Sequence, residues 1–198
     1  MAHEFYSTPA EIVVPLIREL YPVPPNLRQQ VFDPGAGVGA LGEVVLEELP
    51  RAVVSGIEID KNIVVDAAHA YNGEVLTGDF LKMYPLFLKP HFIICNPPFS
   101  QWTEFVDRIF ETCVGLTASD NATTVAVLGR LGMLASQGRH AWWVRQHPGL
   151  KLRVLSMRPS FTGDGHTDRY DYAWYVWGLT NGAPAIDWYK GGEFDEGG

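Results

Sequence analysis

Four residues, Asn96-Pro97-Pro98-Phe99, strongly constrain how the middle of this chain can fold. They follow a short apolar run at residues 91–95, which is typical of a buried strand. Neither proline has an N–H to donate, so the strand must end there in a rigid turn. In an open α/β sheet, ligands bind outside the carboxyl ends of the strands. The turn is therefore expected to hold Asn96 and Phe99 at the ligand-binding edge.

The chemistry of this turn suits a planar amine. The side-chain carbonyl of Asn96 and the backbone carbonyl of Pro97 can each accept a proton from an exocyclic NH₂ group. Together they would turn the nitrogen lone pair towards an electrophile. Phe99 could cover the flat face of the base, a contact that contributes about 1–3 kcal/mol. Without a ligand, the same residues would be a strand-ending turn with an Asn cap and a core Phe.

A glycine-rich loop, Asp33-Pro34-Gly35-Ala36-Gly37-Val38-Gly39, lies upstream between a predicted strand and a helix that begins near Ala40. Glycines let the backbone pass close to a ligand, and the helix N-terminus adds N–H donors and positive potential. The glycine spacing alone also fits a dinucleotide-binding fold. The acid at the start of the loop, Asp33, would suit a ligand that carries an ammonium group.

A second acid, Glu58, ends the next predicted strand at residues 52–58. It lies about 20 residues beyond the glycines, the spacing at which a carboxylate accepts both hydroxyls of a ribose. The alternative is an ordinary surface acid. Its place after a run of apolar and small residues favours ligand contact.

Together these motifs resemble the class I S-adenosylmethionine (SAM)-dependent methyltransferases. More narrowly, they resemble the amino-methyltransferases with an (Asp/Asn/Ser)-Pro-Pro-(Tyr/Phe) signature, chiefly DNA adenine-N6 enzymes. The resemblance runs over residues 6–178 and implies SAM as the cofactor. It also implies a single Rossmann-like α/β domain, with a mainly parallel seven-stranded sheet flanked by helices and strand seven antiparallel.

The resemblance assigns further cofactor-binding residues. The family carries an aromatic-x-Thr-Pro stretch that touches the methionine part of SAM, and Tyr6, Thr8 and Pro9 match it. From the residues alone, Thr8 and Pro9 also begin a helix, in which Glu11 would complete a capping box. Asp79 and Phe80 match the acid that accepts the SAM adenine amine and the ring that covers it. The remaining members of the predicted cofactor site are Asp33, Gly35, Gly37, Glu58 and Asn96.

A polar loop between the last two predicted strands would complete the substrate site. It resembles the loop of small phage-type adenine methyltransferases in which an aromatic residue contacts the flipped base. Phe161 is the candidate for that contact. Arg158 and Arg169 flank the loop and are expected to hold phosphates of the substrate.

No metal site is predicted. The two cysteines, Cys95 and Cys113, have neither zinc-ligand spacing nor the number needed for a disulfide framework. Asp164, His166 and Asp168 alternate in a way that could ligate a metal, but such clusters are common in polar loops. The implied SAM chemistry needs no metal either.

Composition limits the partners and the domain plan. Lys and Arg number 15 against 23 Asp and Glu, a net charge of −8, which is unusual where phosphate contacts dominate affinity. Part of the acid excess lies near the C-terminal end. We therefore predict a methyltransferase domain at residues 1–180 and a flexible acidic, glycine-rich tail at 181–198. No stretch approaches a membrane span, no signal peptide is evident, and the cysteine usage fits a cytoplasmic protein.

The sequence thus predicts methyl transfer from SAM to the N6 amine of adenine in DNA. The base would be flipped out or single-stranded, and Asn96, Pro97 and Phe99 would be catalytic. Few residues follow the last predicted strand, so we expect short or relaxed sequence specificity. The alternatives are an RNA base amine (adenine N6 or guanine N2), a protein glutamine N5, or a non-catalytic subunit. A phage or restriction-modification role is implied by resemblance only, and the sequence does not fix the oligomeric state.

Overall fold

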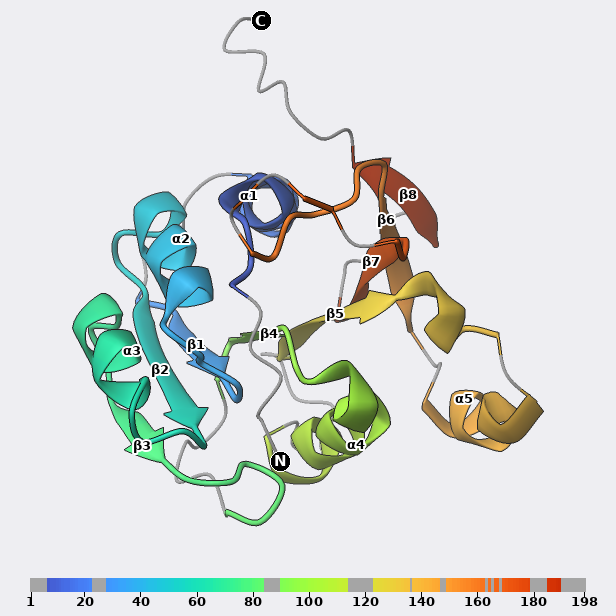
Figure 1. The fold of residues 1–198 in the computed structure, drawn as a ribbon. Helices are drawn as coiled ribbons and strands as arrows, with labels where there is room; N and C mark the ends of the chain where they lie inside the picture. Colours follow the sequence, from blue (N-terminus) through green and yellow to red (C-terminus); the bar gives the residue numbers. More distant parts are fainter. Residues whose placement is uncertain are drawn as a thin grey trace, which may run out of the picture.

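The computed structural model describes residues 7–22, 28–83, 90–113, 123–135, 137–146, 149–162, 164, 166–167, 169–178 and 185–189. These residues form one sheet with helices on its two faces (Figure 1). The strands are β1 (Gln30–Asp33), β2 (Val53–Glu58), β3 (Val75–Thr77), β4 (Phe92–Cys95), β5 (Thr124–Arg130), β6 (Lys151–Leu155), β7 (Tyr172–Trp177) and β8 (Ile186–Tyr189). The α-helices are α1 (Ala10–Leu20), α2 (Ala40–Glu48), α3 (Val64–Ala70), α4 (Trp102–Thr112) and α5 (His140–Gln146). Short 3-10 turns are η1 (Phe99–Gln101), η2 (Leu131–Met133) and η3 (Gln137–Arg139).

The sheet order is β3-β2-β1-β4-β5-β7-β6-β8. Strands β1 to β5 pair in parallel, whereas β7 lies antiparallel to both β5 and β6. This confirms the predicted α/β class, the mainly parallel sheet and the antiparallel seventh strand. The order reverses at β1 and β4, which is where open α/β sheets bind ligands.

The sheet has one strand more than the predicted seven. Strand β8 pairs in parallel with β6 and falls within the segment that we expected to be a flexible tail. The buried side chain of Arg153 on β6 helps to explain its position. Arg153 donates to Glu19 of α1 with an Nε–Oε2 distance of 2.7 Å, and the Tyr189 hydroxyl of β8 donates to the same Glu19 oxygen. The acid-rich and glycine-rich composition of this segment concealed a strand of four residues.

Adjacent aromatic residues on β7 show which helices cover each face. Trp174 donates through Nε1 to the carbonyl of Ile12 in α1, at 2.7 Å. The ring of the next residue, Tyr175, lies 4.8 Å from the ring of Trp102 in α4. Successive side chains of a strand point to opposite faces, so α1 and α4 cover opposite faces of the sheet, as Figure 1 shows. No helix in the described ranges is long and apolar enough to cross a membrane.

The first helix begins later than predicted. Helix α1 starts at Ala10 with Pro9 as its N-cap and has no side-chain cap hydrogen bond, so the predicted capping box with Glu11 is wrong. The Thr8 hydroxyl instead accepts a hydrogen bond from Asn96 Nδ2 at 3.0 Å. A contact between these distant residues thus replaces the local cap.

Candidate active site

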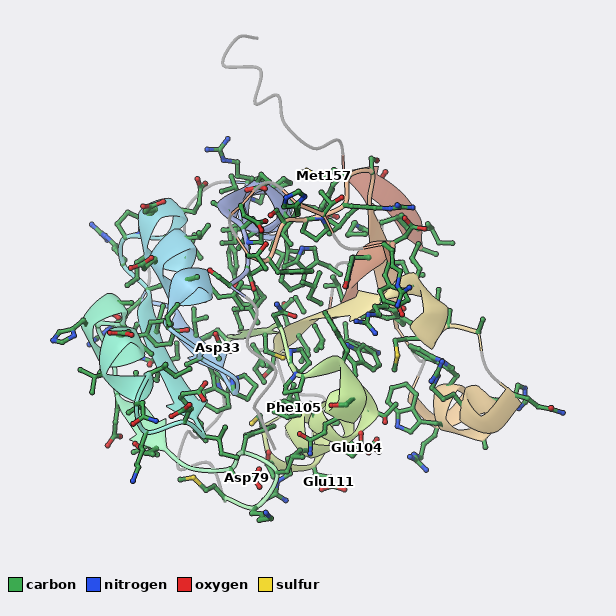
Figure 2. The ribbon with its side chains drawn as sticks, in the orientation of Figure 1. Asp33, Asp79, Glu104, Phe105, Glu111 and Met157 are labelled. Carbon is green, nitrogen blue, oxygen red and sulfur yellow. The ribbon has the colours of Figure 1, made fainter. Side chains whose placement is uncertain are left out.

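A cleft of about 820 Å³, including its open mouth, lies at the carboxyl ends of the parallel strands. Its wall contains the glycine loop after β1, the end of β2, the turn after β3 and the turn after β4. Figure 2 shows Asp33 at the end of β1, Asp79 after β3 and Phe105 on α4 around this region.

Glu58 shapes the glycine loop and also lines the cleft. Its Oε2 accepts the N–H of Gly37 at 2.7 Å, and its Oε1 accepts the N–H of Asp60 at 2.8 Å. Gly37 and Gly39 have φ angles of 56° and 98°, which favour glycine, and a Cβ at Gly39 would lie 2.5 Å from Ala70 Cβ. The carboxylate thus fixes the loop that forms the cleft wall.

Asp33 lies behind the glycine loop rather than in the cleft wall. Its side chain is fully buried and accepts the N–H of Gly35 at 3.0 Å and the hydroxyl of Tyr71 at 2.8 Å. The pKa of Asp33 is raised to about 7, chiefly by burial and to a smaller extent by the nearby Glu58, although the bonds from Tyr71 and Gly35 lower it. The structure gives Asp33 a role in holding the loop, and direct contact with a ligand ammonium stays a prediction.

Tyr71 is a supporting residue that sequence reasoning missed. Besides its bond to Asp33, its ring lies where a Cβ at Gly42 or Gly56 would be, within 2.0 Å and 3.0 Å respectively. Those two glycines therefore make room for Tyr71 rather than for a ligand. No local pattern could reveal it, because the residue follows α3 and contacts a loop far away in the sequence.

The predicted adenine-binding pair follows β3. Asp79 lines the cleft, where its Oδ1 accepts the N–H of Leu81 at 3.0 Å and its Oδ2 lies 2.8 Å from exposed Lys82 Nζ. Phe80 also lines the cleft, and its ring centroid is 5.3 Å from that of Phe105. Sequence reasoning assigned Phe105 to the core by its helical spacing. The structure shows that this residue contributes to both the core and the cleft.

Asn96 lies directly after β4 and lines the same cleft as Thr8, which accepts its Nδ2 hydrogen bond. This bond fixes the plane of the amide and places the acceptor oxygen Oδ1 on its opposite side. The next residue, Pro97, is buried. A rigid amide at the carboxyl end of a central strand is the arrangement expected from the sequence.

Phe99 lies outside the cleft wall in an aromatic cluster. Its ring centroid is 5.3 Å from that of Tyr172 and 6.3 Å from that of Phe161, and all three side chains are buried. The Arg130 guanidinium carbon lies 4.7 Å from the Phe99 centroid and 3.9 Å from that of Tyr170. The structure therefore brings the two predicted base-contacting rings, Phe99 and Phe161, side by side. The sequence did not reveal Arg130, which is contributed by the end of β5.

The remaining predicted residues lie in several places. Pro9 caps α1 and does not line the cleft, and Tyr6 is outside the described residues. Arg158 pairs with Asp171 at 3.0 Å, whereas Arg169 lies 5.5 Å from the ring of Tyr170. Within the described residues no group of three His, Cys, Asp or Glu side chains could hold a metal. Asp168 is not among those residues.

The charge of the cleft suits a cationic cofactor. Glu58 and Asp79 contribute two carboxylates to its wall, and no Lys or Arg is among the described residues that line it. The negatively charged phosphates of a dinucleotide would be disfavoured there, whereas the sulfonium and ammonium groups of SAM would be favoured. A Cβ at Gly35 would lie 3.8 Å from Phe105 Cε1, an ordinary contact distance. The residues present therefore fit SAM.

Comparison with solved structures finds the same fold in several proteins named as methyltransferases. A methyltransferase subunit of a type I restriction-modification system from Streptococcus thermophilus has a TM-score of 0.67 and 15% identity, covering 89% of this chain and 45% of its own. A protein from Listeria monocytogenes assigned to the class I SAM-dependent methyltransferases has a TM-score of 0.67 and 12% identity, with coverages of 94% and 65%. Human methyltransferase 10 domain containing protein has a TM-score of 0.60 and 16% identity, with coverages of 88% and 85%. This chain thus spans less than two thirds of the Streptococcus and Listeria chains. The TM-scores show that the fold is shared, and at identities this low the similarity shows the fold alone.

The family assignment comes from the sequence model named methyltransferase small domain, which matches residues 16–125, more than half of the 198-residue chain. The chain therefore belongs to the methyltransferase small domain family. Comparison with curated protein sequences finds no match.

Proposed function

We propose that this protein transfers a methyl group from SAM to the exocyclic N6 amine of adenine in DNA, with short or relaxed sequence specificity. The observation that carries the proposal is the position of Asn96. Its amide lines the same cleft as Gly35, Gly37 and Glu58, and Phe99 follows it after two prolines. An amine acceptor therefore lies next to the space that fits the methyl donor.

The residues would act mainly by positioning, which can supply a large part of a rate enhancement. SAM supplies an electrophilic methyl group on a positively charged sulfur. Asn96 Oδ1 and the Pro97 carbonyl would accept the two amine protons, so that the nitrogen lone pair is directed into the cleft. The bond from Asn96 Nδ2 to Thr8 holds the amide in the required orientation. Phe99 would cover the flat face of the base.

The choice of DNA has two sources of support. The signature Asn-Pro-Pro-Phe resembles that of DNA adenine-N6 enzymes, and one structural neighbour is named as a subunit of a restriction-modification system. A base within a duplex could not reach Asn96, so the base would be flipped out or taken from a single strand. Only the short turn η1 separates Asn96 from α4, so few side chains there could read neighbouring bases. Each good bidentate base contact provides only about 1–3 kcal/mol of discrimination.

The direct test uses single-stranded oligonucleotides and SAM labelled in the transferred methyl group. Thymine has no exocyclic amine, so an all-thymidine strand is the matched control for strands that carry one adenosine, one cytidine or one guanosine. We expect label only in the adenosine strand. Matching RNA strands and a glutamine-containing protein would run beside them. Transfer confined to RNA or protein, or to cytidine or guanosine, would contradict the proposal.

Sequence preference needs a second measurement. Plasmid DNA methylated by the purified protein would be sequenced by a method that detects modified adenines. We expect a site of one to three bases. A strict motif of five or more base pairs would show that recognition is more extensive than proposed.

A further inference from the structure

A second cavity lies beside the aromatic cluster and is rich in arginine. Arg130, Arg139 and Arg169 all line it, together with Tyr170 and Asp171. Arg130 is the last residue of β5, and Arg139 ends η3. Three arginine side chains from separate segments therefore line one cavity, in a protein whose net charge is −8.

The described lining of this cavity contains three arginines and one carboxylate. Among the described lining residues the only carboxylate is Asp171, and its Oδ1 already accepts from Arg158 Nε at 3.0 Å. Arg139 donates to the backbone carbonyls of Gly132, Met133 and Ala135. Those carbonyls orient its guanidinium without neutralising it. Arg169 is exposed and contacts the face of Tyr170.

The cavity is connected to the proposed target site through Arg130. The same guanidinium lies over the ring of Phe99, three residues after Asn96, and over the ring of Tyr170. A substrate group in the cavity would therefore be a close neighbour of a base stacked near Phe99. In a nucleic acid strand, the group next to a base and its sugar is a phosphate.

We infer that this cavity, lined by Arg130, Arg139 and Arg169, binds a backbone phosphate of the substrate strand beside the target nucleotide. Arginine suits this role, because its planar guanidinium can donate two parallel hydrogen bonds to phosphate oxygens. The inference rests on the proposed function and makes it more specific. A cationic cavity favours a nucleic acid strand, whereas a neutral glutamine side chain would gain nothing from it.

The experiment measures binding rather than methyl transfer. The full chain, loaded with SAM, would be titrated with a fluorescent single-stranded oligonucleotide, and the anisotropy followed over a series of salt concentrations. Arg169→Gln is the main variant, because the side chain is exposed and its contact among the described residues is with the ring of Tyr170. Arg139→Gln is the second, and Arg28→Gln is the matched control. Arg28 is exposed and lies just before β1, at the opposite edge of the parallel strands.

We expect Arg169→Gln and Arg139→Gln each to weaken strand binding by about tenfold, as for loss of a charge-assisted hydrogen bond. Each should also reduce the slope of log affinity against log salt by about 0.7, the value for one phosphate contact on a single strand. Arg28→Gln should change neither quantity. SAM affinity by calorimetry and the melting temperature of Arg169→Gln should stay at wild-type values.

Two results would overturn the inference. If Arg169→Gln and Arg139→Gln bind the strand as tightly as wild type does, and with the same salt slope, the cavity holds no phosphate. If inorganic phosphate displaces the strand as effectively as unlabelled all-thymidine oligonucleotide does at equal phosphate concentration, the cavity holds free phosphate instead. The proposed function can fail independently of this inference. If strand binding depends on the arginines but no methyl group is transferred to DNA, the proposed function is wrong and the phosphate site stands.

Discussion

The proposed cofactor half of the sheet, at the ends of β1, β2 and β3, and the proposed target half, around Phe99 and Arg130, are built by different kinds of contact. On the cofactor side, carboxylates accept backbone N–H groups: Asp33 from Gly35, Glu58 from Gly37, and Asp79 from Leu81. The target side relies on rings and a guanidinium, as in the contacts of Phe99, Arg130 and Tyr170. On the cofactor side, hydrogen bonds from backbone N–H groups to carboxylates hold the loops in place. On the target side, tilted rings and a guanidinium pack against one another instead.

Asn96 lies between the two halves and gives the sharpest way to separate them. Asn96→Ala removes the acceptor that orients the amine, so we expect kcat to fall by about a hundredfold or more, as for misplaced reacting groups. SAM affinity should fall far less than turnover, because Gly35, Gly37 and Glu58 of the same cleft are unchanged. Turnover under saturating SAM and calorimetric titration with SAM would measure the two effects.

Asn96→Asp is the matched control for that substitution. The carboxylate keeps an acceptor oxygen, and the Thr8 hydroxyl can donate to it in place of accepting from Nδ2. We expect much of the lost turnover to return. Near-normal rates in Asn96→Ala would show that the amide does not orient the amine, and would break the proposed division between the halves.

Glu58→Ala tests the cofactor half alone. It removes both the carboxylate in the cleft wall and the acceptor for the N–H groups of Gly37 and Asp60. Loss of charged hydrogen bonds of this kind should weaken SAM binding by about tenfold to a hundredfold in calorimetry. Glu48→Ala is a suitable control, because that acid pairs with Arg18 on the helices away from the cleft. Unchanged SAM affinity in Glu58→Ala would remove Glu58 from the site.

The same contrast explains what the sequence could predict. Acids and glycines at strand ends determine local backbone geometry, so strand β1, the glycine loop and the start of α2 are found where the spacing placed them. Asn96 is found in the same way, because two prolines must end a strand. These signals are short-range and can be read directly from neighbouring residues.

Contacts between distant residues left no such signal. Arg130 reaches Phe99 and Tyr170 only because β5 and β7 pair and bring their ends together. Thr8 was expected to cap its own helix but contacts Asn96 instead. Strand β8 pairs with β6 and contacts Glu19, the partner of Arg153, through Tyr189, which the composition of β8 does not indicate.

Phe99→Ala tests the target half. It removes the ring beside the expected base position. We expect kcat/KM for the nucleic acid substrate to fall by a factor that corresponds to about 1–3 kcal/mol of lost stacking. Phe99→Tyr should be tolerated, and SAM affinity should not change. Phe110→Ala is a matched control, because that ring packs on Trp177 at a centroid distance of 5.3 Å and lines neither cavity. An equal loss of kcat/KM in Phe110→Ala would show that the effect is one of packing.

The smallest expected effect concerns the pH dependence of the cofactor half. Burial raises the pKa of Asp33 from 3.8 to about 7, so the folded protein holds a proton that the unfolded chain releases. The contribution to stability is therefore complete below pH 3.8 and is lost as the pH rises towards 7. Asp33→Asn cannot titrate, and its amide oxygen can still accept the N–H of Gly35. We expect the free energy of unfolding of wild type, relative to Asp33→Asn, to fall by about 1 kcal/mol or more over this pH range. Denaturant unfolding at several pH values would measure it, and a difference that stays constant with pH would show that Asp33 is ionised when folded.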